Sequence, residues 1–443
     1  MEKARKICVD MLEVVFNKNA YSNIVLRQTL NKNKIDDKDK GLITEIVYGT
    51  IKYKYTIDTI LNNFLKKGIK SLDSYVLNIL RITVYQIKFL DKIPNFAAVN
   101  EAVEIAKKEK SVGASKLVNG VLRNYLRNLD KKYYNDKNLV ETLCFKYSYD
   151  KWLVNMLIKQ YGNEIAEDIL KGLNERPAVT VRVNNLKTDY DEAFSNLQEY
   201  GYDVEEGYIC PEAIVINKGK SIEKNPLFKE GKITVQDESA MLVAPSIDAK
   251  EGATVLDLCS APGGKTTHIS EIMNNTGIVK AFDIHENKLS LVKENAKRLG
   301  INNISCAEMD ASKFNKELEN SADMVLIDVP CSGLGIIRKK PEIKYTKDIK
   351  STKDIVAIQK KIMENAAKYV KKEGTLLYST CTINKEENEK NINWFIKKFP
   401  EYKVEPLFYG NMSNIIYNEN GTVTILPNKY MDGFFIAKLK KTR

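Results

Sequence analysis

Short apolar segments alternate with helical segments from about residue 233 onward, and this alternation constrains the fold more than any other feature of the chain. It predicts strands that pair in parallel within one sheet, with helices covering its faces. We therefore expect a doubly wound α/β domain over 233–443, with its ligands bound beyond the carboxyl ends of the strands. The predicted strands are Val255–Leu258, Ile278–Ile284, Met324–Ile327 and Thr375–Tyr378, and the predicted helices lie near 265–274, 286–299 and 353–371.

The residues before this domain divide into three parts. Residues 1–140 carry apolar side chains at helical spacing, as in Val99 and Val103, and lack strand-like alternation, so we expect an all-α domain. A helical connector is expected over 141–172. Residues 173–232 combine short β-rich runs with one amphipathic helix, which predicts a small α+β domain. A length of 443 residues also indicates a multidomain chain.

The net charge of +11 is concentrated in the first part of the chain. Residues 1–140 contain 26 basic and 15 acidic side chains, whereas the remaining residues contain 43 of each. On the last predicted helix of this part, Lys116, Arg123 and Arg127 fall on one face. These three residues alone could simply form a solvated face, but the excess charge of the whole part favours a surface that binds a nucleic acid.

The cysteine and histidine content argues against extracellular and metal-binding classes. Seven cysteines without a close C-x-x-C pair and two histidines predict neither a disulfide framework nor a zinc site, so we expect no metal. The first 16 residues carry six charged side chains, unlike a signal peptide, and no apolar run reaches the roughly 18 residues of a membrane span. We therefore expect a cytoplasmic monomer that does not associate with membranes.

A glycine turn follows the first predicted strand of the α/β domain and opens a helix. Gly263 and Gly264 lack a Cβ, so a ligand can approach the amides at the helix N-terminus. A phosphate-binding P-loop would require glycine in place of Cys259, which disfavours that class. A Rossmann-like adenosine site instead predicts an acidic residue after the second strand, where Asp283 stands, and Asp310 after the third strand can accept from an adenine amino group. The turn residues expected to bind this ligand are Cys259, Ser260, Ala261, Pro262, Gly263, Gly264 and Lys265.

Two cysteines also stand directly after predicted strands. Cys331 closes the stretch Asp328-Val329-Pro330-Cys331, and Cys381 follows Thr380. Both are predicted to lie in the same crevice as the glycine turn, beside a carboxylate, so we expect this pair to be functional. The other cysteines are expected to act as small apolar side chains, as a lone cysteine usually does, and we place in this group Cys8, Cys144, Cys210 and Cys306.

Together these motifs resemble those of the S-adenosylmethionine-dependent RNA cytosine-C5 methyltransferases. The helical first part resembles NusB, an RNA-binding transcription antitermination factor, particularly over 96–106 and 116–124. The order of the parts is similar to the RsmB (Sun or Fmu) family of bacterial 16S rRNA methyltransferases, in which the α+β domain is RRM-like. The resemblance covers nearly the whole chain. The matching stretches are Arg182–Asn184, Thr234–Asp237, Cys259–Lys265, Asp283, Asp310, Asp328–Cys331, Thr380-Cys381 and Asp432–Phe435.

The resemblance implies a reaction. S-adenosylmethionine is the implied cofactor, 16S ribosomal RNA the implied partner, and the equivalent of cytosine 967 the implied target. Carbon 5 of cytosine is a weak nucleophile, so a thiolate first adds to carbon 6. Cys381 is the implied nucleophile, and Cys331 is implied to assist breakdown of the adduct. Asp328 is implied to hydrogen-bond the cytosine edge and also to lie among the cofactor-binding residues.

Further RNA contacts are expected outside the helical part. Residues 331–372 contain 12 basic and 4 acidic side chains, which suggests phosphate contacts from Arg338, Lys339 and Lys340, although a solvated helix would explain this charge equally well. Arg182 is also expected to contact RNA, because it lies in one of the family motifs.

The chain departs from the family pattern at two positions, and two other functions remain open. Val329 stands where the family often has alanine, a small change, and Asn428 stands where it often has histidine, which nothing in the sequence explains. The alternatives are the same chemistry on tRNA and a non-catalytic RNA-binding assembly factor. A DNA cytosine methyltransferase is disfavoured, because such enzymes resemble this chain in the proline-cysteine motif but do not need Cys381.

Overall fold

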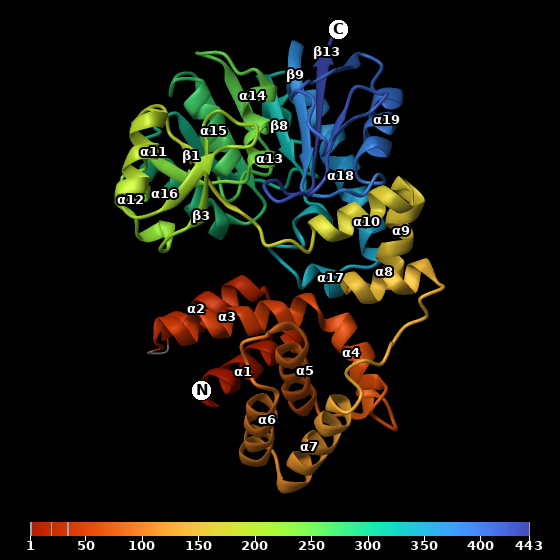
Figure 1. The fold of residues 1–443 in the computed structure, drawn as a ribbon. Coiled ribbons are helices and arrows are strands. Elements are labelled where there is room, and N and C mark those ends of the chain that lie inside the picture. The colour runs from red at the N-terminus through yellow and green to blue at the C-terminus, as the bar shows by residue number, and fades with distance from the viewer. Residues whose placement is uncertain (1, 19, 33–34, 443) are drawn as a thin grey trace. The chain divides into compact units, whose positions relative to one another are not determined.

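The computed structural model describes residues 2–18, 20–32 and 35–442 (Figure 1). They form two compact units. The first unit comprises Met1–Asn174 and Ile337–Asp348, so a short segment from late in the sequence belongs with the N-terminal part of the chain. The second unit comprises Glu175–Ile336 and Ile349–Arg443. No helix among the described residues is both long and apolar enough to cross a membrane.

The first unit is helical, which confirms the all-α prediction. Its central helix is α5 (Ser74–Phe89), in which eleven consecutive residues are buried, and Asp73 caps this helix by accepting a hydrogen bond from the N–H of Val76. The other helices are α1 (Glu2–Lys18), α2 (Ser22–Lys32), α3 (Asp37–Lys52), α4 (Lys54–Asn62), η1 (Ile69–Ser71), α6 (Asn95–Glu109), α7 (Val112–Leu126), α8 (Leu139–Tyr147), α9 (Lys151–Tyr161) and α10 (Asn163–Gly172).

The late segment Ile337–Asp348 is held in this unit by a buried lysine. The Lys344 side chain is 2% exposed, and its Nζ donates to the carbonyl oxygens of Lys52 and Ser148, at 3.0 and 3.1 Å. It also lies 3.0 Å from Oδ1 of Asn174. These contacts satisfy oxygen atoms from three separate places in the first 174 residues, so the segment forms part of the core of the unit.

A second set of contacts fixes the same segment on either side of Lys344. Glu342 accepts hydrogen bonds from both the N–H and the O–H of Ser22, at 3.2 and 2.7 Å. Tyr345 lies in the short helix α17 (Ile343–Thr346), and its hydroxyl accepts from the N–H of Tyr55. The segment is therefore bound to both α2 and α4.

The second unit begins with a small antiparallel sheet of order β2-β3-β1-β4, which confirms the predicted α+β domain. Its core packs Val181 and Val183 against Ala193 and Leu197 of the helix. The elements are β1 (Val179–Val183), α11 (Tyr190–Glu199), β2 (Asp203–Glu206), β3 (Ala213–Lys218), η2 (Ile222–Lys224), α12 (Pro226–Lys229) and β4 (Ile233–Val235).

The large sheet of this unit has the order β11-β12-β13-β9-β8-β5-β6-β7, and β10 also pairs with β13. The strands are β5 (Thr254–Asp257), β6 (Ile278–Asp283), β7 (Ile304–Glu308), β8 (Ala322–Asp328), β9 (Val370–Thr380), β10 (Tyr402–Glu405), β11 (Ile415–Tyr417), β12 (Val423–Ile425) and β13 (Phe434–Lys441). The pairs among β5 to β9 are parallel, as the α/β prediction requires. The pair of β13 with β9 is antiparallel, so the sheet is mixed (Figure 1).

Helices cover both faces of the large sheet. Because side chains alternate along a strand, Val325 and Ile327 pack with α18 and α19, whereas Leu326 packs with α14 and α15. The helices are α13 (Glu238–Met241), α14 (Val243–Ile247), α15 (Gly264–Ile272), α16 (Glu286–Leu299), η3 (Lys316–Leu318), η4 (Leu334–Ile336), α18 (Ile349–Tyr369) and α19 (Glu389–Lys398). With helices on both faces, the open end of the sheet is left for the site.

Replacing Lys344 with methionine tests the buried contacts of the late segment. The Lys344→Met variant keeps an unbranched side chain but leaves buried carbonyl oxygens without a donor, so we expect the free energy of unfolding of the first unit to fall by about 3 kcal/mol. Urea denaturation measures this change. The matched control is Lys347→Met, in the same segment but without such contacts, and it should change the free energy by less than about 0.5 kcal/mol. Equal stability of both variants would contradict the conclusion that the buried hydrogen bonds of Lys344 stabilise the first unit.

Candidate active site

The candidate site lies at the carboxyl ends of the parallel strands in the second unit. β5 ends at Asp257, β6 at Asp283, β8 at Asp328 and β9 at Thr380. Asp328 pairs in register with Ser379, so the loops that follow β8 and β9 leave the sheet side by side. The structure thereby brings the two cysteine motifs together as predicted.

The two candidate cysteines are in contact. The Sγ atoms of Cys331 and Cys381 lie 3.4 Å apart, and both side chains are partly exposed. The hydrogen bond to Cys381 is the main cause that raises the pKa of Cys331, and burial and the nearby Glu387 and Asp328 carboxylates act in the same direction. Cys331 therefore holds its proton more strongly than an ordinary thiol, and either sulfur atom can be the donor in this contact. Among the remaining cysteines, Cys8, Cys144 and Cys210 are buried as expected, whereas Cys259 and Cys306 are partly exposed.

Asp328 links the cysteine loops to the glycine turn. Its Oδ2 accepts a hydrogen bond from Nζ of Lys265 at 2.7 Å, and its Oδ1 accepts from Oγ of Ser379 at 2.8 Å. Burial alone would lower the pKa of Lys265, but the negative charges of Asp328 and other neighbouring groups together raise it. Lys265 thus stays protonated beside the thiols, where a positive charge favours a thiolate.

The glycine turn has the backbone that the sequence predicted. Gly263 has a left-handed φ of 101°, and a Cβ on it would come within 3.1 Å of the Cα of Val292. Ser260 donates from both its N–H and its hydroxyl to the carbonyl oxygen of Phe282, which ties the turn to β6. Burial raises the pKa of Asp257, behind the turn, to about 7.

The acidic residues at the other strand ends suit an adenosyl group. One oxygen of Asp283 accepts from the N–H of His285 at 2.9 Å, and its second oxygen has no hydrogen bond to any described residue. That free oxygen matches a ribose hydroxyl. Asp310 accepts from both the N–H and the hydroxyl of Ser312, and the hydroxyl contact is the main reason that its pKa is lowered. Both groups are therefore hydrogen-bond acceptors at or just beyond the carboxyl ends of β6 and β7, and their proposed contacts with an adenosyl group stay a prediction.

Arg182 corrects one prediction. It was expected to contact RNA, but its side chain is 0% exposed. Its guanidinium binds the Glu271 carboxylate through Nε and Nη2, at 3.1 and 2.7 Å, and donates to the carbonyl oxygen of Gly264 at 3.0 Å and to Gln236. Arg182 therefore joins β1 to both ends of α15, through Gly264 at its start and Glu271 near its end, and supports the glycine turn. Glu271 lies two turns after Gly264 on the same face of α15, but nothing in the sequence alone connects it with Arg182.

The other predicted RNA contacts differ in accessibility. Lys116, Arg123 and Arg127 are exposed at α7 and form no ion pair among the described residues. Arg338 is only 7% exposed, which removes it as a simple surface contact, whereas Lys339 and Lys340 are partly exposed. Lys116, Arg123 and Arg127 are therefore the most exposed of the basic residues that are predicted to contact RNA.

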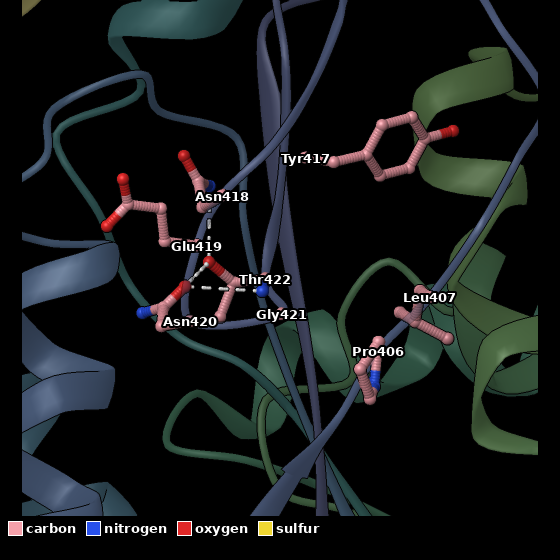
Figure 2. A pocket seen from close by; sticks show the side chains of 8 residues that line it. All are labelled: Pro406, Leu407, Tyr417, Asn418, Glu419, Asn420, Gly421 and Thr422. Atoms are coloured by element: carbon pink, nitrogen blue, oxygen red, sulfur yellow. Dashed lines mark hydrogen bonds between the residues drawn. The ribbon is translucent and has the colours of Figure 1, made fainter.

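A pocket of about 420 Å³ in the second unit is separate from this constellation (Figure 2). It lies between Pro406-Leu407 and the turn that joins β11 to β12, where Asn420 accepts a hydrogen bond from the hydroxyl of Thr422. Its lining contains none of the predicted site residues.

Three residues near the cysteines were not predicted from the sequence. Ser379 donates a hydrogen bond to Asp328. Glu387 and Asn388 follow Cys381 closely and contact the two cysteine loops.

Comparison with known proteins agrees with this arrangement. Residues 244–440 match the family model for the 16S rRNA methyltransferase RsmB/F, residues 2–127 match the NusB family, and residues 149–223 match the ferredoxin-like domain of RsmF/B-like methyltransferases. The solved structure of PH0851 has a TM-score of 0.84 at 30% identity, with 99% of each chain covered. The structure of NSun6 from Pyrococcus horikoshii with SFG shares the fold, with a TM-score of 0.59 at 24% identity, over 67% of this chain and 99% of that one.

Curated relatives extend over the full length. The "Probable ribosomal RNA small subunit methyltransferase B" of Bacillus subtilis is 39% identical, with 99% of this chain and 98% of the relative covered. The protein of the same name from Synechocystis is 32% identical, with 100% of both covered. The predicted family, its methyltransferase fold and its NusB-like first part are thereby confirmed. The chain belongs to the ribosomal RNA small subunit methyltransferase B family.

Proposed function

We propose that this protein methylates carbon 5 of a cytosine in 16S ribosomal RNA through a covalent bond between Cys381 and carbon 6 of the base. The observation that carries the proposal is the 3.4 Å separation of the Cys331 and Cys381 sulfur atoms, beside Asp328 and the glycine turn. Carbon 5 of cytosine cannot take a methyl group unaided, so a thiolate must add to carbon 6 first. Two adjacent thiols can divide the work of attack and release.

The residues around the glycine turn would hold the methyl donor. S-adenosylmethionine, when bound, supplies an electrophilic methyl group. The free oxygen of Asp283 would accept from the ribose hydroxyls, and Asp310 would accept from the adenine amino group. The turn of Cys259–Lys265 presents backbone at the N-terminus of α15. Asp328 lies between this turn and the cysteine loops and would contact both ligands.

Attack by Cys381 makes carbon 5 reactive. The bond forms between Sγ of Cys381 and carbon 6, and the electron pair of the 5,6 double bond becomes available at carbon 5. Asp328, held by Lys265 and Ser379, can hydrogen-bond the protonated ring nitrogen and stabilise the adduct. After methylation, removal of the proton on carbon 5 restores the double bond and expels the Cys381 thiolate. Cys381 thus returns to its starting form.

The contact between the sulfur atoms would make Cys331 available for this release only after Cys381 has bonded to the base. Its pKa is raised chiefly by the hydrogen bond to Cys381. Once Cys381 is bonded to carbon 6, its sulfur is a thioether and only a weak hydrogen-bond partner, so this cause is reduced and Cys331 ionises more easily. Its thiolate can then take the carbon 5 proton, directly or through another base.

Substitution of each cysteine tests the two roles. Cys381→Ala should abolish methylation, because no thiolate remains to attack carbon 6. Cys331→Ala should allow attack but slow release, so a covalent protein–RNA adduct should accumulate. Denaturing gel electrophoresis with labelled RNA measures the adduct, and Cys306→Ala, on β7, is the control expected to behave as wild type. An active Cys381→Ala together with a dead, adduct-free Cys331→Ala would reverse the assigned roles.

The substrate is tested with purified protein and labelled S-adenosylmethionine. Bare 16S RNA should receive label on cytosine, and 5-methylcytosine at the equivalent of cytosine 967 should be missing from a deletion strain. Label in tRNA alone would indicate that the same reaction takes place on tRNA and not on 16S RNA. Absence of label in every RNA tested would support a non-catalytic assembly factor instead.

The exposed basic residues of the first unit should contribute to RNA affinity through phosphate contacts. Replacing Lys116, Arg123 and Arg127 with alanine should weaken RNA binding and lower the slope of log affinity against log salt concentration by about two to three. The matched control removes three exposed lysines from α16, namely Lys288, Lys293 and Lys297. This control should change the slope by less than about one. Equal slopes for the two triple variants would remove the α7 face as an RNA contact.

A further inference from the structure

Two adjacent buried residues, Glu387 and Asn388, hold the two cysteine loops of the second unit. Both side chains are 0% exposed. They stand just before α19 (Glu389–Lys398), and the carbonyl oxygen of Glu387 accepts hydrogen bonds from the hydroxyl of Tyr378 at 2.5 Å and from the side chain of Asn391 at 3.1 Å. The pair is thus anchored both to β9 and to α19.

Glu387 binds the loop that carries Cys331. Its carboxylate accepts from the N–H of Ser332 at 2.8 Å and from the Ser332 hydroxyl at 2.6 Å. It also accepts from the amides of Gln359, at 3.2 Å, and Asn384, at 3.0 Å. All four groups are donors, which explains a carboxylate here, since a glutamine would turn an N–H₂ group toward other donors. Gln359 in turn donates to the carbonyl oxygen of Pro330 at 3.0 Å, so Cys331 is held on both sides.

Asn388 binds the loop that carries Cys381. Its Oδ1 accepts from the hydroxyl of Thr380 at 2.7 Å, and its Nδ2 donates to the carbonyl oxygen of Thr382 at 2.9 Å. These are the residues immediately before and after Cys381. The backbone on both sides of the proposed nucleophile is therefore fixed by one amide side chain.

The two loops are also joined to each other by ordered hydroxyl groups. The Oγ atoms of Ser332 and Thr382 lie 2.8 Å apart. Because the Ser332 hydroxyl donates to Glu387, it must accept from Thr382, so the hydrogen bonds run in one direction from Thr382 through Ser332 to the carboxylate. This chain connects the residue after Cys381 to the residue after Cys331.

We propose that Glu387 and Asn388 are positioning residues that set the separation of the two thiols, with Asn388 controlling attack by Cys381 and Glu387 controlling release by Cys331. The inference rests on the roles given to the cysteines in the proposed function. Buried hydrogen-bonded carboxylates and amides keep a loop in one geometry, and a displacement of a reacting group by about 1 Å can slow a step by about 100-fold. Each residue should therefore affect one step of the reaction.

Adduct formation and adduct release are measured separately. In Glu387→Gln, adduct formation should stay within about twofold of wild type while release slows at least tenfold, since the loop of Cys331 is loosened by an N–H₂ group facing donors. This loosening should outweigh the easier ionisation of Cys331 that follows when the Glu387 charge is removed. In Asn388→Asp, a carboxylate oxygen faces the carbonyl oxygen of Thr382. Combined with Cys331→Ala, which traps the adduct, Asn388→Asp should slow adduct formation at least tenfold relative to Cys331→Ala alone.

Matched controls use the same changes at exposed neighbours. Glu386→Gln alters a surface glutamate that pairs with Lys390, and Asn393→Asp alters an exposed amide of α19. Both should leave formation and release within about twofold of wild type. Binding of S-adenosylmethionine should be unchanged in all four variants, because a general loss of structure would lower cofactor binding and both steps together.

Ser332→Ala provides a second test if Glu387→Gln does not fold. It removes one hydroxyl from the Cys331 loop and should slow release at least about threefold without slowing attack. Wild-type release in Ser332→Ala and Glu387→Gln, or equal slowing of both steps in Glu387→Gln, would overturn the positioning role while the proposed function stands. If Cys331→Ala traps no adduct, the proposed cysteine roles fail instead, whatever the Glu387 variants do.

Discussion

The proposed chemistry of this protein depends first on the parallel pairing of β8 with β9. Cys331 and Cys381 are 50 residues apart in sequence, and they meet because the backbone register aligns Asp328 with Ser379 at the ends of the two strands. A shift of one residue in that register would turn every side chain of a strand to the opposite face. Antiparallel pairing of β13 with residues 375–380 of β9 helps to fix the position of β9 in the sheet. The register of the sheet thus brings the two cysteine loops side by side, and the side chains that hold these loops then set the distance between the thiols.

Ion pairs then link the segments that the sheet brings together. Lys265 and Asp328 link the glycine turn to the cysteine motifs, and Arg182 and Glu271 link the small sheet to α15 behind the same turn. The Arg182–Glu271 pair is buried, so removing one of its partners leaves an uncompensated buried charge, which is strongly destabilising. The small α+β domain therefore supports the proposed cofactor site through Arg182, in addition to any role toward RNA.

The sequence predicted the parts of the site that depend on local pattern. The glycine turn, Asp283 and the two cysteines each follow an apolar strand, and parallel strands place such loops at one edge. Arg182 shows where this reasoning fails, because its burial depends on Glu271, 89 residues away. Glu387 and Asn388 sit in a polar run that reads as a solvated turn, and only the loops that fold over them make them buried. The direction in which β13 pairs with β9 also could not be predicted, because the periodicity of apolar residues does not show which strands pair or in which direction.

The discontinuous first unit has a consequence for the order in which the protein folds. Its first 174 residues leave the ribosome well before Lys344, which is added about 170 residues later. At roughly 5–20 residues per second, this delay lasts about 10–30 s. During that time the carbonyl oxygens of Lys52 and Ser148 lack the donor that Lys344 later supplies. The helical unit thus reaches its final form only after most of the catalytic unit has been synthesised, and the two cannot be exchanged between proteins by joining them end to end.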